Sequence, residues 1–578
     1  MRILFVYPNR ETQLGINHGL ASLSAVLKAA GHETRLVNIN SELAPVPTAE
    51  DVYQLVSEWQ PGLIGFSCLT QQYAEARSMA ERLRELACAD QDELAPLVAG
   101  GIHPTLVPEQ VMADGVWDHV GVGECEHSLL ELVERLENGG GAEDVPNVLS
   151  WEAGRRPGPD SSAETRWRRN PVAPFPALTE LPAPDLGLFD LQRITAAKGG
   201  WFSLLTSRGC PYRCTYCLNH RIVDLYRSER RQRVSQLGFL RQRPIPSIIS
   251  EVQGLLSTVP GITTFILDDD LFTQDREHAL EFCAAWEQAG ILVPFVVNAH
   301  VKQLDSEVAA ALKRAGCSIL KLGIESGSER VRRRVLARPM TRSAIEETVA
   351  IATRAGLHTS GFVMVGLPTE TSAELFETVQ LLADTRIGRF RTSFFHPFPG
   401  TEALRLAQEA GQYTPATADG SGTTFTDGSP LDFGAEHNLL VDKVGRAMPW
   451  FVNAALGSAS SGSGHAAGAQ FADRYGPLVE RVLAMDLGAW QTFRSTIAAV
   501  DREYSAAATA AGEFHYALRY GTTTGVSSDW FLAEEAAEWN TAAAIPRIAR
   551  TQSLDTPKRP SASRTPRETA PAPGVLVR

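Results

Sequence analysis

Three of the eight cysteines in this 578-residue chain lie close together, at Cys210, Cys214 and Cys217. Thiolates at this C-x3-C-x2-C spacing can bind three irons of a 4Fe-4S cluster and leave the fourth iron open to a ligand. The alternative is a zinc site that His220 completes, because three cysteines and a histidine form a common tetrahedral set. The spacing lacks the paired C-x2-C motifs typical of zinc folds, so we favour the iron–sulfur cluster.

The residues around this loop resemble the radical S-adenosylmethionine (SAM) superfamily. The family's CxxxCxxC loop matches, and so does the aromatic residue before its last cysteine, Tyr216. Further along, Leu267–Phe272 resembles the family's DD-x-F element and Gly323–Ser328 its GxESGS element. Later family elements are matched by Gly361–Pro368 and Pro397–Thr401.

The resemblance implies that SAM binds at Tyr216, Asp269, Glu325 and Ser326. A carboxylate at Asp269, directly after an apolar strand, could accept hydrogen bonds from the SAM ammonium; the alternative is a helix N-cap. Glu325 could hold the ribose hydroxyls or the amine. Ser326 could bind the SAM carboxylate, or it could make a buried structural hydrogen bond. Arg338 stands where the family often has lysine, and we interpret it as a surface charge.

The elements that carry these side chains alternate between strands and helices. Short apolar runs separated by helical periodicity predict six parallel strands, at Ser203–Thr206, Thr263–Leu267, Phe295–Asn298, Ile319–Gly323, Ser360–Val365 and Thr392–His396. Parallel strands with intervening helices predict a partial TIM barrel, a βα fold that binds its ligands at the carboxyl ends of the strands.

A second βα alternation occupies the first 140 residues. Its strands are predicted at Ile3–Tyr7, Arg35–Val37, Leu63–Ser67, Leu97–Gly101 and Val116–Gly123. Five such units predict a doubly wound, Rossmann-like parallel sheet, so the protein belongs to the α/β class. Ligands of such sheets lie beyond the carboxyl ends of the strands, where the loops of this chain are polar and rich in glycine.

Next to a radical SAM barrel, this first domain resembles a cobalamin (B12)-binding domain. A nucleotide tail along a sheet edge needs glycine where the backbone comes close, and hydroxyl groups to bond it. The predicted cobalamin-binding residues are Ser67, Thr70, Gly100, Gly101, His103, Gly123 and Glu124.

The region after the first strand departs from one group of cobalamin enzymes. Mutases and methionine synthase carry a DxHxxG motif there, whose histidine ligates cobalt, and residues 9–19 of this chain lack it. The resemblance is therefore to the class B radical SAM methyltransferases. His18 and His103 are candidates for contacting the corrin, with a hydrogen-bonding or surface role as the alternative.

Changes in composition along the chain predict five segments. A cobalamin-binding domain at 1–140 is followed by a connector rich in Pro and Gly at 141–195 and by the radical SAM barrel at 196–405. Residues 406–550 are predicted to be mainly helical and are a candidate substrate lid. Residues 551–578 contain almost no large apolar side chains, which predicts a disordered tail.

The overall charge and hydropathy exclude several classes of protein. Fifty-four Lys and Arg against 67 Asp and Glu leave a net charge of −13, which argues against nucleic acid as a partner. The first apolar run, Ile3–Tyr7, is too short for a signal peptide, and no run reaches the roughly 18 apolar residues of a membrane span. Because the clustered cysteines indicate metal rather than disulfides, we expect a cytoplasmic protein with no membrane partner.

The resemblance implies a cobalamin-dependent radical SAM methyltransferase with a 4Fe-4S cluster, SAM and cobalamin as cofactors. A methyl group would pass from SAM through methylcobalamin to an unactivated carbon, or a phosphinate phosphorus, of a small-molecule natural product, as in antibiotic biosynthesis. The external electron donor would be a flavodoxin or ferredoxin. The alternatives are a B12-dependent radical SAM cyclase, ring-contracting enzyme or isomerase, and a non-catalytic cobalamin or Fe–S sensor.

Overall fold

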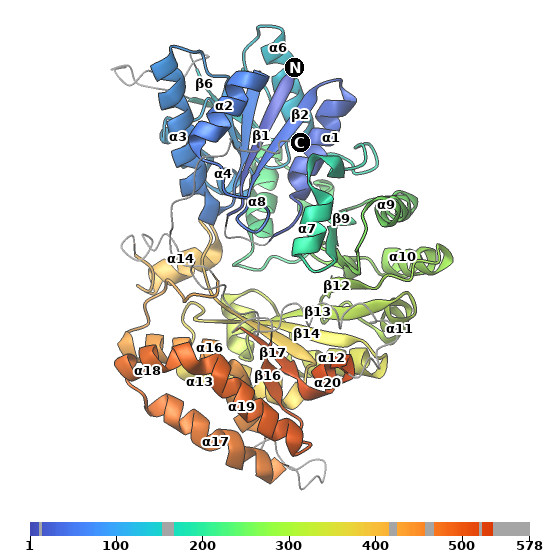
Figure 1. Cartoon of the computed structure of the whole chain (residues 1–578), viewed down its shortest axis with the longest axis vertical. Coiled ribbons are helices and arrows are strands. Elements are labelled where there is room, and N and C mark those ends of the chain that lie inside the picture. Colours follow the sequence, from blue (N-terminus) through green and yellow to red (C-terminus); the bar gives the residue numbers. More distant parts are fainter. Residues whose placement is uncertain (11–13, 153–166, 415–424, 457–467, 520–522, 536–578) are drawn as a thin grey trace, which may run out of the picture. The chain divides into compact units, whose positions relative to one another are not determined.

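The computed structural model describes residues 1–10, 14–152, 167–414, 425–456, 468–519 and 523–535 (Figure 1). Within these residues the chain forms two compact units. Unit 1 comprises Met1–Gly199 and Leu225–Gly238, and unit 2 comprises Gly200–Asp224 and the described residues from Phe239 onward. The tail predicted at 551–578 lies outside the described residues.

Unit 1 is built on a seven-stranded sheet with the order β2-β1-β3-β4-β5-β6-β7. Its first five strands run parallel and are β1 (Arg2–Pro8), β2 (Glu33–Ile39), β3 (Leu63–Ser67), β4 (Leu97–Gly100) and β5 (His119–Gly121). The five predicted strands and the doubly wound sheet are thereby confirmed. The strand order reverses between β1 and β3, where sheets of this topology bind ligands beyond their carboxyl ends.

Helices cover both faces of this sheet. Figure 1 shows α2 and α3 on one face and α1 and α6 on the other. The sequence fits this burial: α2 begins at a capping box between Thr48 and Asp51 and turns Val52, Leu55, Val56 and Trp59 into the core. The unit 1 helices are α1 (His18–Ala29), α2 (Ala49–Trp59), η1 (Thr70–Gln72), α3 (Tyr73–Asp90), α4 (Ile102–Leu106), α5 (Pro108–Ala113), α6 (Glu126–Glu137), η2 (Leu186–Leu188) and α7 (Leu191–Ala197).

The segment interpreted as a connector adds two strands to unit 1. β6 (Val148–Trp151) pairs antiparallel with β5, and β7 (Trp167–Arg169) pairs antiparallel with β6. All four residues of β6 are buried, and Trp151 packs edge to face against Trp167 with ring centroids 5.7 Å apart. Strands this short show no alternation of apolar and polar residues that the sequence could reveal.

Unit 2 contains an eight-stranded sheet with the order β16-β17-β15-β14-β13-β12-β11-β8. Six strands run parallel and confirm the six predicted ones: β8 (Trp201–Leu204), β11 (Thr264–Leu267), β12 (Phe295–Ala299), β13 (Cys317–Glu325), β14 (His358–Val365) and β15 (Arg389–Phe394). In the described residues the sheet ends at β8 and at β16, which do not pair with each other. The fold is therefore the expected partial barrel.

The other elements before the C-terminal region complete the βα pattern of unit 2. A short antiparallel pair of strands, β9 and β10, flanks the cysteine loop. These elements are β9 (Ser207–Arg208), α8 (Leu218–Arg230), η3 (Val234–Gln236), β10 (Arg241–Gln242), α9 (Ile245–Thr258), η4 (Phe272–Gln274), α10 (Arg276–Gln288), α11 (Ser306–Arg314), η5 (Val331–Val335), α12 (Arg342–Arg354) and α13 (Ser372–Thr385). The second half of α8 and all of η3 belong to unit 1.

The C-terminal region is mainly helical, as predicted, but it also extends the barrel sheet. β17 (Thr524–Ser527) pairs antiparallel with β15, and β16 (Tyr516–Leu518) pairs antiparallel with β17. The Asn453 side chain exchanges two 2.8 Å hydrogen bonds with the backbone of Tyr516, which fixes β16 against α16. The helices are α14 (Glu402–Glu409), α16 (Ala435–Leu456), α17 (Gly468–Ala484), α18 (Leu487–Phe493), η6 (Arg494–Thr496), α19 (Ile497–Ala510) and α20 (Ser528–Glu535).

None of the helices in the described ranges is both long enough and apolar enough to cross a membrane.

The close approach of β17 to β15 makes a testable prediction. A Cβ added at Gly525 would lie 2.5 Å from the ring of Phe390, its partner in the register. Gly525→Ala should therefore lower the free energy of unfolding by about 1–3 kcal/mol, the usual cost of overpacking. Gly254→Ala in α9 is the matched control, since a Cβ there meets nothing within 4 Å; it should stabilise the protein by about 0.5–1 kcal/mol. Equal urea midpoints for Gly525→Ala and wild type would contradict this placement of β17.

Candidate functional site

The three clustered cysteines follow β8 and β9, at the carboxyl end of the first barrel strand. Gly209 has a φ of +93°, and an added Cβ would lie 2.3 Å from the Phe239 carbonyl oxygen, so the turn into Cys210 requires glycine. Cys214 is buried, and Cys210 and Cys217 are partly exposed. Burial raises the pKa of Cys210 to about 11 and that of Cys217 to about 12, and the charge on Cys214 acts on both thiols.

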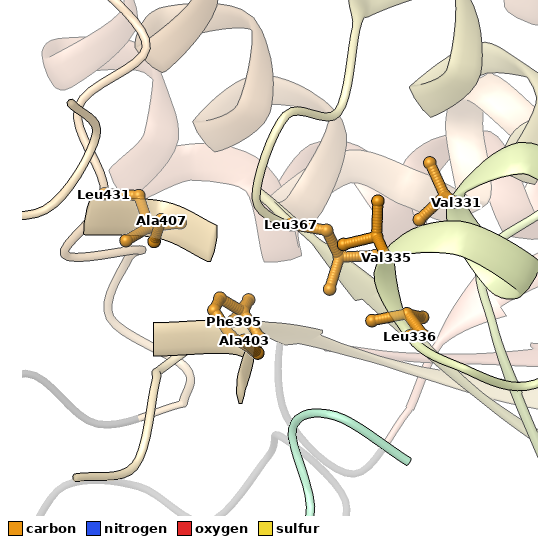
Figure 2. Close-up of a cluster of buried hydrophobic side chains, with 8 residues drawn as sticks. All are labelled: Val331, Val335, Leu336, Leu367, Phe395, Ala403, Ala407 and Leu431. Atoms are coloured by element: carbon orange, nitrogen blue, oxygen red, sulfur yellow. The ribbon is translucent and has the colours of Figure 1, made fainter. Parts of the chain in front are cut away.

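Thr215 holds the middle of the loop. Its hydroxyl donates to the Val335 carbonyl at 2.6 Å, its N–H donates to the Leu336 carbonyl at 3.1 Å, and its carbonyl accepts from the Ala403 N–H at 3.1 Å. All three partners belong to a hydrophobic cluster that also includes Val331, Leu367, Phe395, Ala407 and Leu431 (Figure 2). The side chain of Tyr216 packs against the same cluster. The packing between η5, α14 and the strand ends thus positions the cysteine loop.

Asp269, predicted to bind SAM, lies at the end of β11 and is fully buried. Its carboxylate accepts from the backbone N–H groups of Thr206 at 2.6 Å and Ser207 at 2.9 Å, and from the Thr206 hydroxyl. Burial raises the pKa of Asp269 to about 6, although these hydrogen bonds oppose the rise. Both carboxylate oxygens are used inside the protein, so the contact that the structure gives Asp269 is with the segment leading into the cysteine loop.

The next aspartate, Asp270, is oriented differently. It is exposed, and its charge acts on the thiols of both Cys210 and Cys217. Of the two adjacent carboxylates, Asp270 is therefore the one whose charge raises the pKa of these cysteines. Sequence patterning missed this because neighbouring positions at a strand end point to opposite sides, and only the buried one is easily identified.

Tyr216, Glu325 and Arg338 form a buried polar network beside the loop. The Tyr216 hydroxyl donates to Glu325 Oε1 at 2.8 Å, and Arg338 Nη1 lies 3.4 Å from the same hydroxyl. Arg338 Nε lies 4.0 Å from Glu325 Oε1, and Arg338 Nη2 donates to the Gly323 carbonyl at 2.7 Å. The two predicted SAM residues Tyr216 and Glu325 are thus brought together, although they lie far apart in the sequence.

The interpretation of Arg338 as a surface charge is wrong. Its residue is only 8% exposed, and Nη1 donates to Cys214 Sγ at 3.3 Å. Burial disfavours its charge, but Tyr216, Glu325 and Cys214 more than compensate and keep the pKa of Arg338 above its usual value. Surface statistics for arginine predict exposure, whereas a carboxylate and a thiol on neighbouring elements make this burial possible.

Glu325 occupies a strained position at the end of β13. Its φ is +67°, in the left-handed region that non-glycine residues rarely adopt, and the register with β14 shifts there. Gly323 leaves the space that the network needs, because an added Cβ would lie 2.5 Å from Glu325 Oε1 and 3.0 Å from Arg338 Nη2. Burial raises the pKa of Glu325, while Arg338 and Tyr216 oppose that rise.

Ser326, the fourth predicted SAM residue, is fully buried. Its hydroxyl accepts from the Ser328 N–H at 3.2 Å, and its carbonyl accepts from Arg332 Nη1 at 2.7 Å. The structure therefore gives Ser326 the structural hydrogen bond that the sequence left as its alternative.

An aromatic contact at the same end of the barrel was not predicted from the sequence. His300 directly follows β12, and its ring stacks on Tyr212 of the cysteine loop, with centroids 3.9 Å apart. Burial lowers the pKa of His300 to about 3, so the ring is neutral at neutral pH. Its place after a predicted strand was the available signal, because polar residues at such positions face the mouth of a barrel.

The chemistry of this loop fits an iron–sulfur cluster. The three thiols lie on one short loop, and burial raises the pKa of each of them. The buried cation of Arg338 opposes that rise at Cys210 and Cys214, where it favours the thiolate form. Across the described residues, no three His, Cys, Asp or Glu side chains are arranged to hold a single metal ion. A cluster does not require such convergence, because each cysteine binds a different iron.

In unit 1, the structure brings the loops after β3 and β4 together. The His103 ring stacks on Tyr73 with centroids 4.3 Å apart, and its Nδ1 lies 3.4 Å from Thr70 Oγ1. Gly101 has a φ of +97°, and an added Cβ would lie 2.9 Å from both the N and O atoms of Cys68 and 3.2 Å from Ser67 Oγ. Burial lowers the pKa of His103 to about 4, so this imidazole is neutral at neutral pH.

The third loop, after β5, is held by two side chains. The Thr105 hydroxyl accepts from the Gly123 N–H at 2.9 Å, and the Tyr226 hydroxyl accepts from the Glu124 N–H at 3.2 Å. A Cβ at Gly123 would lie 2.4 Å from the Tyr226 hydroxyl, so this glycine makes room for a tyrosine of the same unit. Phe175 stacks on Tyr226 with centroids 3.8 Å apart and completes the support.

Gly100 differs from its neighbours. A Cβ there would meet only the Phe66 carbonyl oxygen, at an ordinary 3.8 Å. The protein itself therefore does not require glycine at this strand end, which fits a position where a bound molecule approaches the backbone. Ser67 pairs with Gly100 in the sheet, and Thr70 and the neutral His103 meet in the adjoining loops. Their hydroxyls and imidazole are groups that suit the polar tail of cobalamin. His18 begins α1, next to Asn17, whose side chain donates to Ser67 Oγ at 3.2 Å.

Two family models match the chain. The radical SAM superfamily matches residues 204–382, and the B12 binding domain matches residues 12–133. The first range contains the cysteine loop and the Tyr216 network, and the second contains the three loops at the edge of the unit 1 sheet.

Several known proteins are similar to this chain. An uncharacterized methyltransferase of Pyrococcus horikoshii is 25% identical over 419 residues, which cover 70% of this chain and 83% of the relative. A cytidylyl-2-hydroxyethylphosphonate methyltransferase of Streptomyces wedmorensis is 24% identical over 433 residues, which cover 67% of this chain and 77% of the relative. Among solved structures, the cobalamin-dependent SAM radical enzyme OxsB, with aqua-cobalamin and SAM bound, has a TM-score of 0.60 at 13% identity and covers 96% of this chain and 84% of that one. At this identity the last likeness concerns the fold.

The buried hydrogen bonds of Asp269 predict how a substitution acts. Asp269→Asn replaces one acceptor oxygen with an NH2 group that cannot accept from Thr206 or Ser207. The free energy of unfolding should fall by about 1.5–3 kcal/mol, the usual value of a hydrogen bond to a charged group, and the iron bound per chain after anaerobic reconstitution should fall with it. Asp268→Asn is the control, since Asp268 is partly exposed at the same strand end. Equal iron content in the two variants would show that Asp269 does not support the loop.

Proposed function

Because the chain belongs to the cobalamin-dependent radical SAM enzymes, we propose that it methylates a small-molecule substrate at an unactivated carbon or a phosphinate phosphorus. The observation that carries the proposal is that one chain holds both a three-cysteine loop at the mouth of a partial barrel and a doubly wound sheet with a polar, glycine-lined carboxyl edge. When bound, the cluster supplies the electron that cleaves SAM, and cobalamin carries the methyl group.

Cys210, Cys214 and Cys217 would hold the cluster. Asp269 and Thr215 orient their loop from its two sides, the first through the preceding strand and the second through the hydrophobic cluster. Gly209 permits the turn between them. Three ligands from one loop leave the fourth iron to SAM, which is what the chemistry requires.

SAM carries a carboxylate and an ammonium, and the network beside the loop offers partners for both. Arg338 supplies a guanidinium for the carboxylate, while Glu325 and Asp270 supply carboxylates for the ammonium or the ribose hydroxyls. Tyr216 keeps Glu325 in place through its hydroxyl. In this proposal Asp269 positions its neighbours, because both of its carboxylate oxygens already accept hydrogen bonds. The Ser326 hydroxyl accepts from the Ser328 N–H and keeps its own O–H to donate to the SAM carboxylate.

The cobalamin site would lie at the carboxyl edge of the unit 1 sheet. Ser67 and Thr70 would provide hydroxyls, Gly100 a strand end without a side chain and His103 a neutral imidazole. Gly101, Gly123 and Glu124 contribute through the backbone, held by Cys68, Thr105 and Tyr226.

The substrate class rests on the similar proteins. A methyltransferase of a phosphonate is among them, which fits a role in natural-product or antibiotic biosynthesis. The strands β16 and β17 join the C-terminal region to the barrel sheet, so residues 406–550 are suited to shape the substrate site. A flavodoxin or ferredoxin would be the electron donor.

The proposal predicts a specific set of products. Protein reconstituted anaerobically should bind about four irons per chain and a corrinoid, and with SAM and a reductant it should release both 5′-deoxyadenosine and S-adenosylhomocysteine. Cys214→Ala should abolish cluster and products, whereas Cys283→Ala, a buried cysteine in α10, should retain both. Deoxyadenosine without S-adenosylhomocysteine would favour a cyclase or isomerase. Bound zinc, or protein without corrinoid, would contradict the proposal.

Gly100 allows the cobalamin site to be tested separately from folding. A Cβ at this position would make only an ordinary van der Waals contact with the Phe66 carbonyl oxygen. In the absence of cobalamin, Gly100→Ala and wild type should therefore unfold at the same urea concentration. The added methyl group should nevertheless weaken hydroxocobalamin binding at least about tenfold, which corresponds to about 1.4 kcal/mol. Equilibrium dialysis with absorbance detection measures the affinity. Unchanged affinity would mean that cobalamin does not approach this strand end.

A further inference from the structure

Arg338 contacts a cysteine of the loop directly. Its Nη1 donates to Cys214 Sγ at 3.3 Å, and the residue is only 8% exposed. Neither this contact nor any role for Arg338 at the sulfur follows from the methyl-transfer proposal, which needs only a cation near SAM.

Two further hydrogen bonds hold Arg338 in place. Its side-chain Nη2 donates to the Gly323 carbonyl at 2.7 Å, and its backbone N–H donates to the Arg332 carbonyl at 2.7 Å. A guanidinium does not lose its proton in proteins, so the positive charge persists at this place. Since the surroundings are buried, the charge acts on the sulfur with little screening by water.

We propose that Arg338 raises the reduction potential of the 4Fe-4S cluster held by Cys210, Cys214 and Cys217. This inference rests on the proposed function in requiring a cluster at these cysteines. Reduction adds one electron to the cluster, and no bond forms or breaks. A nearby positive charge and an N–H···S bond both stabilise the more negative, reduced state, and the potentials of such clusters depend on both.

Glu325 opposes this effect within the same network. Its Oε1 lies 4.0 Å from Arg338 Nε and accepts from the Tyr216 hydroxyl at 2.8 Å. Without the negative charge of Glu325, the positive charge of Arg338 would stabilise the reduced cluster more strongly. The two substitutions should therefore shift the reduction potential in opposite directions. Replacing Arg338 with a neutral residue should lower the potential, and replacing Glu325 with a neutral residue should raise it.

The test is a redox titration of the reconstituted, full-length protein without SAM, with the reduced cluster followed by electron paramagnetic resonance. Arg338→Gln should lower the equilibrium constant for one-electron reduction by about tenfold, which is 59 mV for one electron. Arg338→Lys, which keeps the charge, should shift the potential less. Arg333→Gln is the control for net charge, since Arg333 is an exposed residue of the same segment, paired with Glu329.

Each outcome bears on the inference. Equal potentials for wild type and Arg338→Gln at equal iron content would overturn it, and so would an equal shift in Arg333→Gln. If Arg338→Gln takes up no cluster, Glu325→Gln provides the test. The reduction potential of the cluster in Glu325→Gln should be higher than in wild type, and an unchanged potential would contradict the inference. A wild-type protein that binds no cluster would instead refute the proposed function.

Discussion

A buried arginine beside a cysteine sulfur is the interaction on which the candidate site of unit 2 depends. A guanidinium can be buried only where its charge and its N–H groups find partners, because desolvation costs several kcal/mol otherwise. Cys214, Tyr216 and the Gly323 carbonyl accept from the two Nη groups, and the Glu325 carboxylate, 4.0 Å from Nε, balances the charge. The strained backbone of Glu325 and the missing side chain of Gly323 are consequences of fitting this network into the end of β13.

The two sides of the cysteine loop are supported by different physics. On one side, the Asp269 carboxylate accepts charge-assisted hydrogen bonds from the segment that leads into the loop. On the other side, Thr215 is tied to backbone groups that a hydrophobic cluster holds in place. The cysteines therefore need not provide the rigidity of their own loop and are left to bind a ligand.

The glycines of unit 1 show why residue type alone does not reveal a role. Gly100, Gly101 and Gly123 all follow strands and all resemble ligand-binding positions. In the structure, a Cβ at Gly101 would clash with the Cys68 backbone and one at Gly123 with Tyr226, while a Cβ at Gly100 would meet only the Phe66 carbonyl oxygen at an ordinary distance. Three glycines with the same sequence signal thus have three different neighbours, and only at Gly100 would a Cβ fit without a clash.

The sequence alone determined the α/β class, the eleven parallel strands, the three cysteines and the family, because hydrophobic periodicity and motif spacing are local properties. It did not reveal β6, β7, β16 and β17, since such short strands are stable only through their partners in the sheet. It also placed Arg338 on the surface, and it did not reveal that the Asp269 carboxylate accepts hydrogen bonds from Thr206 and Ser207. Only the tertiary structure decided these points, because the partners of a buried charge come from segments far apart in the chain, and no local pattern records which of them meet.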